Sequence, residues 1–529
     1  MRYTILATSL ALACDALGLV TESNPNPNPT INKTCFTPSH DIARERGFQV
    51  FNAIHSAMRQ WGSSLHHNGL GLIPATVPRG TLLYHGTWRN YTPPDFEWLA
   101  FEMEHAENFA SSTKDARKGP SKGPQPPQPP GQENRQKALG HQSGSNPNRG
   151  YLHTYRTNRD LRLLYIDGMS GGNTDMGTWT RRISCYETLI MPLHTTIGAV
   201  GTISAPCGLD LVSILRTPYQ EDREGASIDL FEWVRAVSRR YDGIGAGRVT
   251  LEFGRMVSGL WYPVNVTNPD PTMIKHPRLI QATSEERAEI LKRVEDVVSS
   301  TRQVNRVDWQ SIADMIVSRY GERLTALAEE EQPAAFASQI YVVTNTFVDY
   351  PATSIDKSAI GATEKMTRQA TQRCVRHFLE PALVWKDEWT DEDALIYTAT
   401  RTVAKRICVD LFRIRSLLLD ASPELAEKLA TRPWSSVGTI PKRLFEAVRE
   451  GKEIILLLME KLDWASWRKC PGCSVGEVCF VPMWPFGLKE DYVHPSCMNQ
   501  SRIDERSWYN SWGNDSYWRL DGAHWLDGR

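Results

Sequence analysis

Apolar positions recur at intervals of three and four residues in several parts of the chain, and this period predicts amphipathic helices. One series follows Ser39, a plausible N-cap, and consists of Val50, Phe51, Ile54, Met58, Trp61 and Leu65. Further series predict helices over 227–241, 312–327 and 390–418, the last of which follows Thr390. Another helix is predicted over 283–298, where Thr283 and Glu286 form a capping box. A short helix is expected over 104–111. The apolar stretch 453–462 fits a core helix or a strand. Residues 280–465 are therefore expected to be mostly helical.

Shorter apolar runs bounded by Gly and Pro predict strands. They cover 69–87, as one or two strands, and 151–157, 161–167 and 247–266. Residues 112–149 are instead dominated by Pro, Gly, Gln, Lys and Ser. Such a stretch cannot bury enough apolar surface to offset the entropy lost on ordering. Because strands resume directly beyond it, we expect a disordered insertion within one domain; a linker between two domains is the alternative.

These patterns predict an α+β protein of more than one domain, as its 529 residues also suggest. We expect a first domain over 39–265 that contains the insertion, a mostly helical domain over 266–465, and a Cys/Trp-rich tail over 466–529. The tail carries four tryptophans, Trp508, Trp512, Trp518 and Trp525.

The first residues place one Arg before an apolar run that small residues close, which is the layout of a secretory signal peptide. We expect the signal over 1–20 and a polar leader over 21–38; a buried N-terminal strand or helix is the alternative. No later segment reaches the apolar length of a transmembrane helix. Sequons at five positions agree with a secreted glycoprotein: Asn32, Asn90, Asn265, Asn499 and Asn514. The net charge of -1 gives no general attraction to nucleic acid.

Ten cysteines are present, and four of them cluster near the C-terminus as Cys470, Cys473, Cys479 and Cys497. Their number and the first spacing fit a tetrahedral zinc site. In an exported protein the same residues more often form two disulfides, so disulfides are favoured here and no metal is expected. Two further pairs are open to disulfide formation, Cys185 with Cys207 and Cys374 with Cys408.

Ser170 lies in a Gly-x-Ser-x-Gly pattern after the predicted strand 161–167. A serine hydrolase needs a helix directly after this serine, so that the hydroxyl stands on a strained turn. The residues that follow are turn-like, which favours a glycine-rich turn. A hydrolase that uses Ser170 is therefore the third functional hypothesis.

The predicted strand TLLYHGT ends in three groups that suit a ligand with ribose hydroxyls and an amide. His85 can donate and accept hydrogen bonds, Gly86 allows close approach to the backbone, and Thr87 adds a hydroxyl. The simpler interpretation is a strand followed by a turn.

This arrangement resembles the ADP-ribosyltransferase fold, in particular its His-Tyr-Glu branch. The His-Gly-Thr motif matches the end of the family's first core strand, and 98–101 followed by 106–109 resembles its aromatic strand and helix. The resemblance is strong over about thirty residues and looser over 75–265. It implies a split-sheet ADP-ribosyltransferase-like domain and NAD as co-substrate.

The resemblance also implies individual roles. His85 would bind a ribose hydroxyl of NAD, Gly86 would hold the nicotinamide amide through its backbone beside Thr87, Trp98 would form a wall of the cleft, and Phe109 would stack on the nicotinamide ring. Two positions depart from the family pattern: Ala106 stands where a Ser is common, and Phe109 replaces a Tyr.

The family's remaining catalytic group is a Glu on a later strand, which stabilises the oxocarbenium-like transition state when the nicotinamide–ribose bond breaks. Glu252, in RVTLEFG, is the only carboxylate suitably placed on the candidate strand. If Glu252 does not fill this role, the domain either binds a nucleotide without cleaving it or binds none.

The whole chain also resembles a group of uncharacterised, predicted secreted fungal proteins that share LLYHGT, LRLLYIDGMS and CFVPMWPFG. That resemblance implies a fungal, exported protein and no particular activity. The first hypothesis is thus an exported ADP-ribosyltransferase or NAD glycohydrolase with an unknown acceptor, and the second is a non-catalytic secreted or surface protein with a degenerate form of the same fold.

Overall fold

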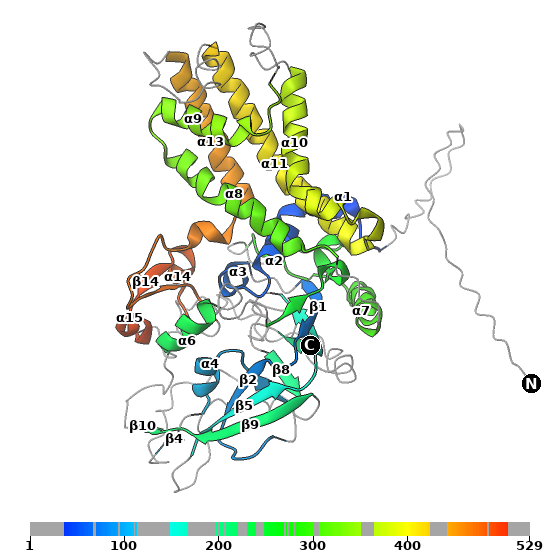
Figure 1. Cartoon of the computed structure of the whole chain (residues 1–529), viewed down its shortest axis with the longest axis vertical. Helices are drawn as coiled ribbons and strands as arrows, with labels where there is room; N and C mark the ends of the chain where they lie inside the picture. The colour runs from blue at the N-terminus through cyan, green and yellow to red at the C-terminus, as the bar shows by residue number, and fades with distance from the viewer. Residues whose placement is uncertain are drawn as a thin grey trace, which may run out of the picture. The chain divides into compact units, whose positions relative to one another are not determined.

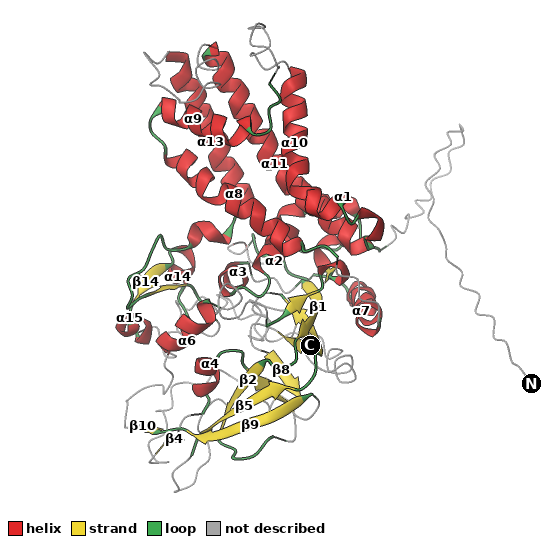
Figure 2. Cartoon of the chain, viewed as in Figure 1, coloured by secondary structure: helices red, strands yellow, loops and turns green. Residues whose placement is uncertain are grey.

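The structure, a computed structural model, describes residues 36–66, 70–93, 96–110, 112–113, 149–167, 196–197, 201–204, 208–220, 230–239, 248–268, 271, 274–279, 281–300, 306–350, 364–423, 442–483 and 486–505. Of these, Thr37–Arg529 contains all but the first residue and forms one compact unit. Helices and strands are both present (Figures 1 and 2), with the strands in small sheets and the helices concentrated beyond residue 283. The predicted α+β class is confirmed.

The first predicted helix is three shorter helices, α1 (His40–Glu45), α2 (Gly47–Ser56) and α3 (Gln60–Leu65). Ser39 caps α1, as predicted, by accepting a hydrogen bond from the backbone N–H of Asp41. The prediction of one continuous helix was wrong: the backbone leaves the helical conformation at Arg46, between α1 and α2, and the chain turns again at Met58, whose φ of 63° lies in the left-handed region. Helices α1 and α2 pack against the long helix α11 (Asp391–Ala421).

A seven-stranded sheet has the order β11-β1-β6-β7-β8-β3, with β12 also paired to β1. The bounds of its strands are β1 Gly71–Val77, β3 Phe96–Leu99, β6 Leu161–Ile166, β7 Thr196–Ile197, β8 Gly201–Ser204, β11 Thr250–Leu251 and β12 Val257–Ser258. Strand β6 runs antiparallel to β1, with Leu72 opposite Ile166 and Val77 opposite Leu161. The strands predicted over 69–77 and 161–167 are confirmed.

A second sheet has three antiparallel strands in the order β2-β5-β9. They are β2 (Leu82–Thr87), β5 (Tyr151–Thr157) and β9 (Leu209–Arg216). Two short strands, β4 (Ser112–Thr113) and β10 (Tyr219–Gln220), pair with each other. Helix α4 (Met103–Glu107) packs against β2. Apart from its two ends, the predicted insertion over 112–149 lies outside the described residues.

The expected helical region contains α7 (Ser284–Ser299), α8 (Trp309–Glu329), α9 (Pro333–Asn345), α10 (Glu364–Leu383), α11 and α13 (Lys442–Leu462). The predicted capping box of Thr283 and Glu286 starts α7, and Thr390 caps α11. The stretch 453–462 belongs to a helix. Among the helices that the structure describes, none combines the length and apolar character needed to cross a membrane.

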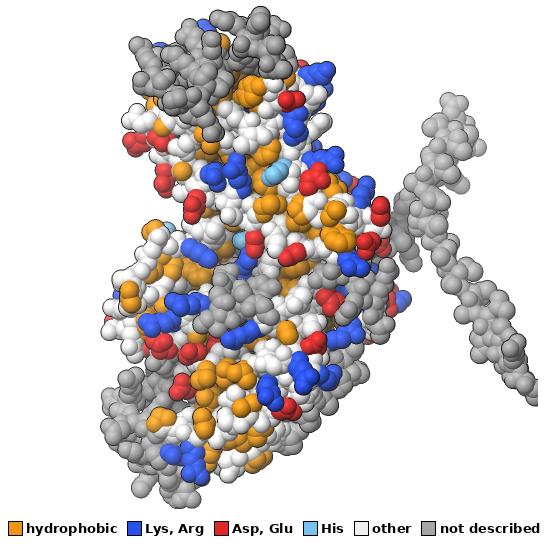
Figure 3. All heavy atoms as spheres, viewed as in Figure 1, with side chains coloured by type: hydrophobic (Ala, Val, Ile, Leu, Met, Phe, Trp, Pro, Cys, Tyr) orange, Lys and Arg blue, Asp and Glu red, His pale blue; other side chains and the backbone are white. Residues whose placement is uncertain are grey.

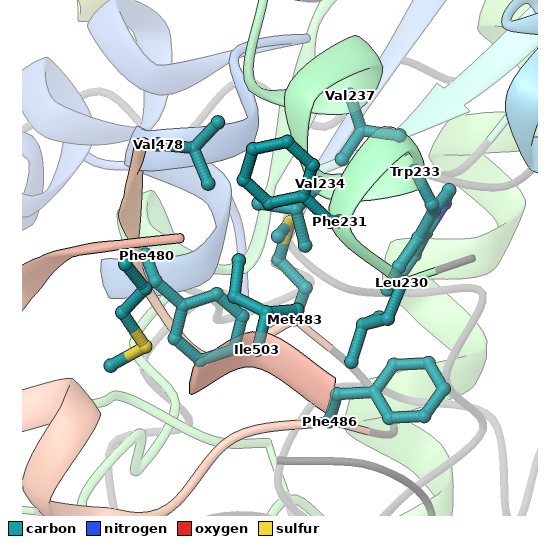
Figure 4. Packing of buried hydrophobic residues seen from close by; sticks show 11 residues of the cluster. Leu230, Phe231, Trp233, Val234, Val237, Val478, Phe480, Met483, Phe486 and Ile503 are labelled. Carbon is teal, nitrogen blue, oxygen red and sulfur yellow. The ribbon is translucent and has the colours of Figure 1, made fainter. Parts of the chain in front are cut away.

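The C-terminal part is rich in cysteine and contains β13 (Val478–Phe480), β14 (Ser496–Met498), α14 (Lys489–Val493) and α15 (Gln500–Asp504). Its apolar side chains pack against one face of α6 (Leu230–Ser238) to form a shared core (Figure 4). Phe231, Val234 and Val237 of α6 meet Phe480 and Met498 of the hairpin there. This core fixes the hairpin to a helix more than 200 residues earlier in the sequence.

Three disulfides connect the described cysteines: Cys374–Cys408, Cys470–Cys479 and Cys473–Cys497. The favoured interpretation of the four C-terminal cysteines as two disulfides is confirmed, as is the pair between α10 and α11. The possible pair of Cys185 and Cys207, the signal peptide, the polar leader and the four tail tryptophans lie outside the described residues.

Candidate functional site

His85 lies on β2 of the three-stranded sheet, and the two faces of this strand have different neighbours. Its side chain is buried and stands directly opposite His153 of β5. The two rings meet edge to face, with centroids 5.8 Å apart. Strand β5 thus adds a second imidazole to the residue singled out from the sequence.

His153 has a well-defined hydrogen-bonding environment. Its Nε2 lies 2.8 Å from the backbone carbonyl oxygen of Arg89, and its Nδ1 lies 3.1 Å from the hydroxyl of Tyr155. Burial lowers the pKa of His153, the hydrogen bond to Arg89 raises it, and the neighbouring His85 lowers it again. We infer a neutral ring at pH 7 that donates from Nε2, because a carbonyl oxygen can only accept, and that accepts at Nδ1.

Gly86 faces the opposite side of the sheet, toward α4. A Cβ at this position would lie 1.8 Å from the carbonyl oxygen of Ala106. Small side chains make this close approach possible, and they form an apolar cluster together with Leu152 and Tyr84: Ala100, Ala106 and Ala110. The packing of α4 on β2 therefore requires glycine at 86 and favours a small residue at 106.

The two motifs that carry the family resemblance lie side by side. Tyr84 and Ala100 exchange two backbone hydrogen bonds, of 2.9 and 2.8 Å, and so join β2 to the chain just beyond β3. Thr87 is buried, and its hydroxyl oxygen accepts a hydrogen bond from the backbone N–H of Arg89. The backbone of Trp98 lies in β3, whereas its side chain is outside the described residues.

Phe109 follows α4, and its side chain is 40% exposed. Its ring stacks on that of His105, with centroids 5.8 Å apart and planes inclined by 26°. His105 in turn meets Trp233 of α6 edge to face, and Trp233 meets Phe486. A row of aromatic and imidazole rings thus connects the exposed Phe109 with the shared core of α6.

Glu252 lies elsewhere, immediately after β11 of the seven-stranded sheet. Its carboxylate is buried and accepts a hydrogen bond of 2.9 Å from the guanidinium of Arg255. Arg255 also donates to the carbonyl oxygens of Val297 and Ser300 at the end of α7. The buried ion pair thereby ties β11 to α7. Within the part of the chain that the structure describes, Arg255 is the polar partner of this carboxylate, which follows a strand of a different sheet from β2.

A second polar cluster holds the turn between α2 and α3. The guanidinium of Arg59 makes two hydrogen bonds, of 2.5 and 2.6 Å, to the carboxylate of Asp314 in α8, and His55 contacts the same carboxylate at 2.8 Å. Burial alone would raise the pKa of Asp314, but the hydrogen bonds from Arg59 and His55 outweigh it and lower the pKa. The N–H of Met58 donates to the hydroxyl of Tyr165 in β6. This turn therefore connects α8 with the seven-stranded sheet.

Sequence reasoning missed His153, Tyr155, His105 and Trp233. A signal was available for the first two, because residues two apart on a strand share a face and YLHTYRT was predicted to be a strand. No comparable pattern marked His105 or Trp233, whose contact joins α4 to a helix far along the chain. Ser170 lies outside the described residues.

Comparison with known proteins gives relatives of no described activity. Residues 39–151 match the family model of the YPL277C N-terminal domain. The chain is 23% identical to the uncharacterised protein YOR389W of Saccharomyces cerevisiae, over 91% of this chain and 90% of that protein. It is 34% identical to the uncharacterised protein YPL277C of the same yeast, over 34% of this chain and 39% of that protein. No solved structure matches the chain. The chain is thus similar to uncharacterised yeast proteins, and its residues 39–151 are similar to the YPL277C N-terminal domain.

Proposed function

We propose that the unit formed by β2, β3 and α4 binds NAD, and that the protein acts by binding this nucleotide rather than by cleaving it. The observation that supports the proposal is the joining of the two motifs through Tyr84 and Ala100. It puts the strand that ends in His85, Gly86 and Thr87 beside the segment that leads to α4 and Phe109.

The chemistry of this unit suits the nicotinamide end of NAD. The imidazole of His85 can donate and accept hydrogen bonds through its two ring nitrogens, which matches the adjacent hydroxyls of a ribose. His85 is buried on the face of β2 opposite α4, so the ligand would have to pass around the end of this strand for His85 to contact the ribose while the 40% exposed ring of Phe109 stacks on the nicotinamide. In this arrangement Gly86 is needed for the packing of α4 rather than for contact with the ligand.

The position of Glu252 is the reason to propose binding without cleavage. An ADP-ribosyltransferase or NAD glycohydrolase needs a carboxylate on the nicotinamide ribose. Glu252 is buried in its pair with Arg255 and would first have to leave that partner. Separating one member of a buried pair costs several kcal/mol, about 3–5 in measured cases. We therefore assign Glu252 a structural role.

Titration of the purified full-length chain with NAD, followed by calorimetry, tests the binding proposal. His85→Ala and Phe109→Ala should each raise the Kd about 2- to 10-fold, because loss of one hydrogen bond or one stacking contact costs about 0.5–1.5 kcal/mol. Phe445→Ala, which removes a ring of similar exposure on α13, is the matched control and should leave the Kd unchanged. Absence of NAD binding by the unaltered chain would refute the proposal.

Release of nicotinamide from NAD tests the second part. We expect none from the unaltered chain. Nicotinamide release that persists in Glu252→Gln would mean that another carboxylate acts on the ribose. Release that Glu252→Gln abolishes would establish the enzyme and overturn the structural role of Glu252. His85→Ala, measured beside them, should abolish any release that depends on this site.

We also propose that the protein is exported and glycosylated. The signal-like N-terminal sequence supports this, and so does the exposure of the three sequon asparagines within the described residues, Asn90, Asn265 and Asn499. Expression of the full gene in a fungal host, followed by an endoglycosidase mobility shift of the protein in the medium, tests it. Retention inside the cell without glycan would refute it.

A further inference from the structure

The four C-terminal cysteines form two neighbouring disulfides, and reduced cysteine sulfurs are also metal ligands. The sulfur atoms of Cys470, Cys473 and Cys479 all lie within 4.8 Å of one another, and Cys497 is bonded to Cys473. We propose that this cluster is a redox-dependent metal site: when a thiol reductant opens both disulfides, the four thiolates bind one zinc ion. This proposal is independent of NAD binding.

The backbone already places the four residues as a tetrahedral thiolate site requires. Cys470 and Cys473 are separated by Pro471 and Gly472, the short loop that supplies two ligands to one metal. Cys479 and Cys497 lie directly opposite each other on the β13–β14 hairpin. The cluster therefore consists of one loop pair and one cross-strand pair.

The distances are close to those of a bound zinc ion. A Zn–S bond of about 2.3 Å in a tetrahedron implies sulfur atoms about 3.8 Å apart. Three of the sulfurs already lie within 4.8 Å. Bonded sulfurs would separate to that distance by side-chain rotation, and the unbonded sulfurs of Cys470, Cys473 and Cys479 would approach by no more than about 1 Å. Cys497 lies outside this group and would have to turn its sulfur toward the other three. The hairpin pairing can remain in place.

The surroundings favour thiolates and allow access. The backbone N–H of Cys470 points at the sulfur of Cys479 at 2.9 Å, and an N–H donor stabilises a thiolate. Basic residues adjoin the cluster: Lys469 precedes Cys470, and Arg502 donates to the backbone carbonyl of Cys497. All four cysteines are partly exposed, so a small thiol and a metal ion can reach them.

The exchange balances with a thiol as reductant. Four thiol molecules reduce the two protein disulfides, giving four cysteine thiols and two small-molecule disulfides. Binding of Zn²⁺ then replaces four S–H protons, which are released to the solvent, and leaves a tetrathiolate centre of charge about -2. No electron is transferred to or from the zinc ion.

The consequence concerns the core that the hairpin shares with α6. Phe480 of the hairpin is buried in the core with α6 (Figure 4), and Met498 belongs to the same core. Either two disulfides or one zinc ion would hold the hairpin in place, whereas a reduced and metal-free hairpin would lose both. The site would thus preserve one fold in oxidising and in reducing surroundings.

The test uses the full-length chain, reduced without oxygen, incubated with ZnCl₂ and passed through a desalting column. Zinc is then counted by mass spectrometry, and Co²⁺ substituted for zinc reports thiolate coordination through its visible absorption. We expect about one zinc ion per chain. The double variant Cys470→Ser/Cys473→Ser should lose at least nine-tenths of it, and the control Cys374→Ser/Cys408→Ser should retain all of it.

Two results would overturn the proposal: no zinc on the reduced unaltered chain, or equal zinc on the Cys470→Ser/Cys473→Ser variant. If reduction in the test tube precipitates the chain, the protein is made without its first 20 residues in a reducing cytosol and its zinc is counted as purified. Four free thiols and no zinc in that preparation would equally contradict the site.

Discussion

Replacement of Gly86 by alanine is the most direct test of how β2 and α4 fit together. The added methyl group would lie 1.8 Å from the carbonyl oxygen of Ala106, whereas real Cβ contacts essentially never fall below 3.0 Å. Backbone atoms make this contact, so no side-chain rotation relieves it. Helix α4 must therefore retreat by at least about 1.2 Å, the difference between these two distances.

Such overpacking typically costs about 1–3 kcal/mol. Because α4 has five residues and follows a segment that contacts β2, we expect the helix to open locally before the whole chain unfolds. A cost of this size corresponds to amide exchange roughly 5- to 150-fold faster in α4 and β2. The NAD binding that we propose should weaken as well, because Phe109 follows this helix.

Hydrogen exchange followed by mass spectrometry measures this change peptide by peptide. The matched control is Gly476→Ala, since a Cβ there would meet no atom within 4 Å and the residue is not in the left-handed region. Unchanged exchange in Gly86→Ala would refute the packing argument. Unchanged exchange together with lost NAD binding would show that Gly86 is there for the ligand.

Three other predictions concern the joints between elements. Asp314→Asn should lower the free energy of unfolding in urea by about 1–3 kcal/mol at pH 7. Because the pKa of this carboxyl is lowered in the folded chain, its contribution to stability is present above the ordinary pKa of about 3.9 and is lost as the pH falls through the folded pKa. A difference in stability from the unaltered chain that does not shrink in acid would contradict the assignment. Arg255→Met leaves Glu252 buried without its partner and should lower the free energy of unfolding by about 3–5 kcal/mol. The double variant Arg255→Met/Glu252→Gln should restore part of this loss. Equal losses in the single and the double variant would show that the pair does not act as a unit. Replacement of both Cys374 and Cys408 by serine removes their disulfide and should lower the free energy of unfolding by about 4 kcal/mol, because the bond closes a loop of 34 residues. A denaturation midpoint equal to that of the unaltered oxidised chain would mean that the disulfide is not formed in solution.

The helical half of the protein follows closely from local signals. The capping box at Thr283, the cap at Thr390 and the apolar period behind them predicted helices that the structure contains. These signals act within one or two turns, which is why a single sequence reveals them. The same holds for β5 and β6, whose apolar runs are bounded by Gly, Asn and Asp.

The break in the helix at Met58 cannot be predicted from the local sequence. The apolar period continues through 58, so the pattern predicts one helix, and no Gly or Pro marks a turn at that residue. The turn is held instead by Asp314, Gln310 and Tyr165, which come from helix α8 and strand β6. Contacts from more than 100 residues away outweigh the cost of a left-handed backbone at Met58.

Some features of the candidate site follow from the local sequence, and others depend on the tertiary structure. Residue types and strand endings marked His85, Gly86 and Thr87, because these depend on neighbours in the chain. The roles of Gly86 in packing α4, of His153 beside His85, and of Glu252 as the partner of Arg255 became visible only in three dimensions. Burial and pairing arise from segments that are distant in sequence, and a motif carries no information about which segment will cover it.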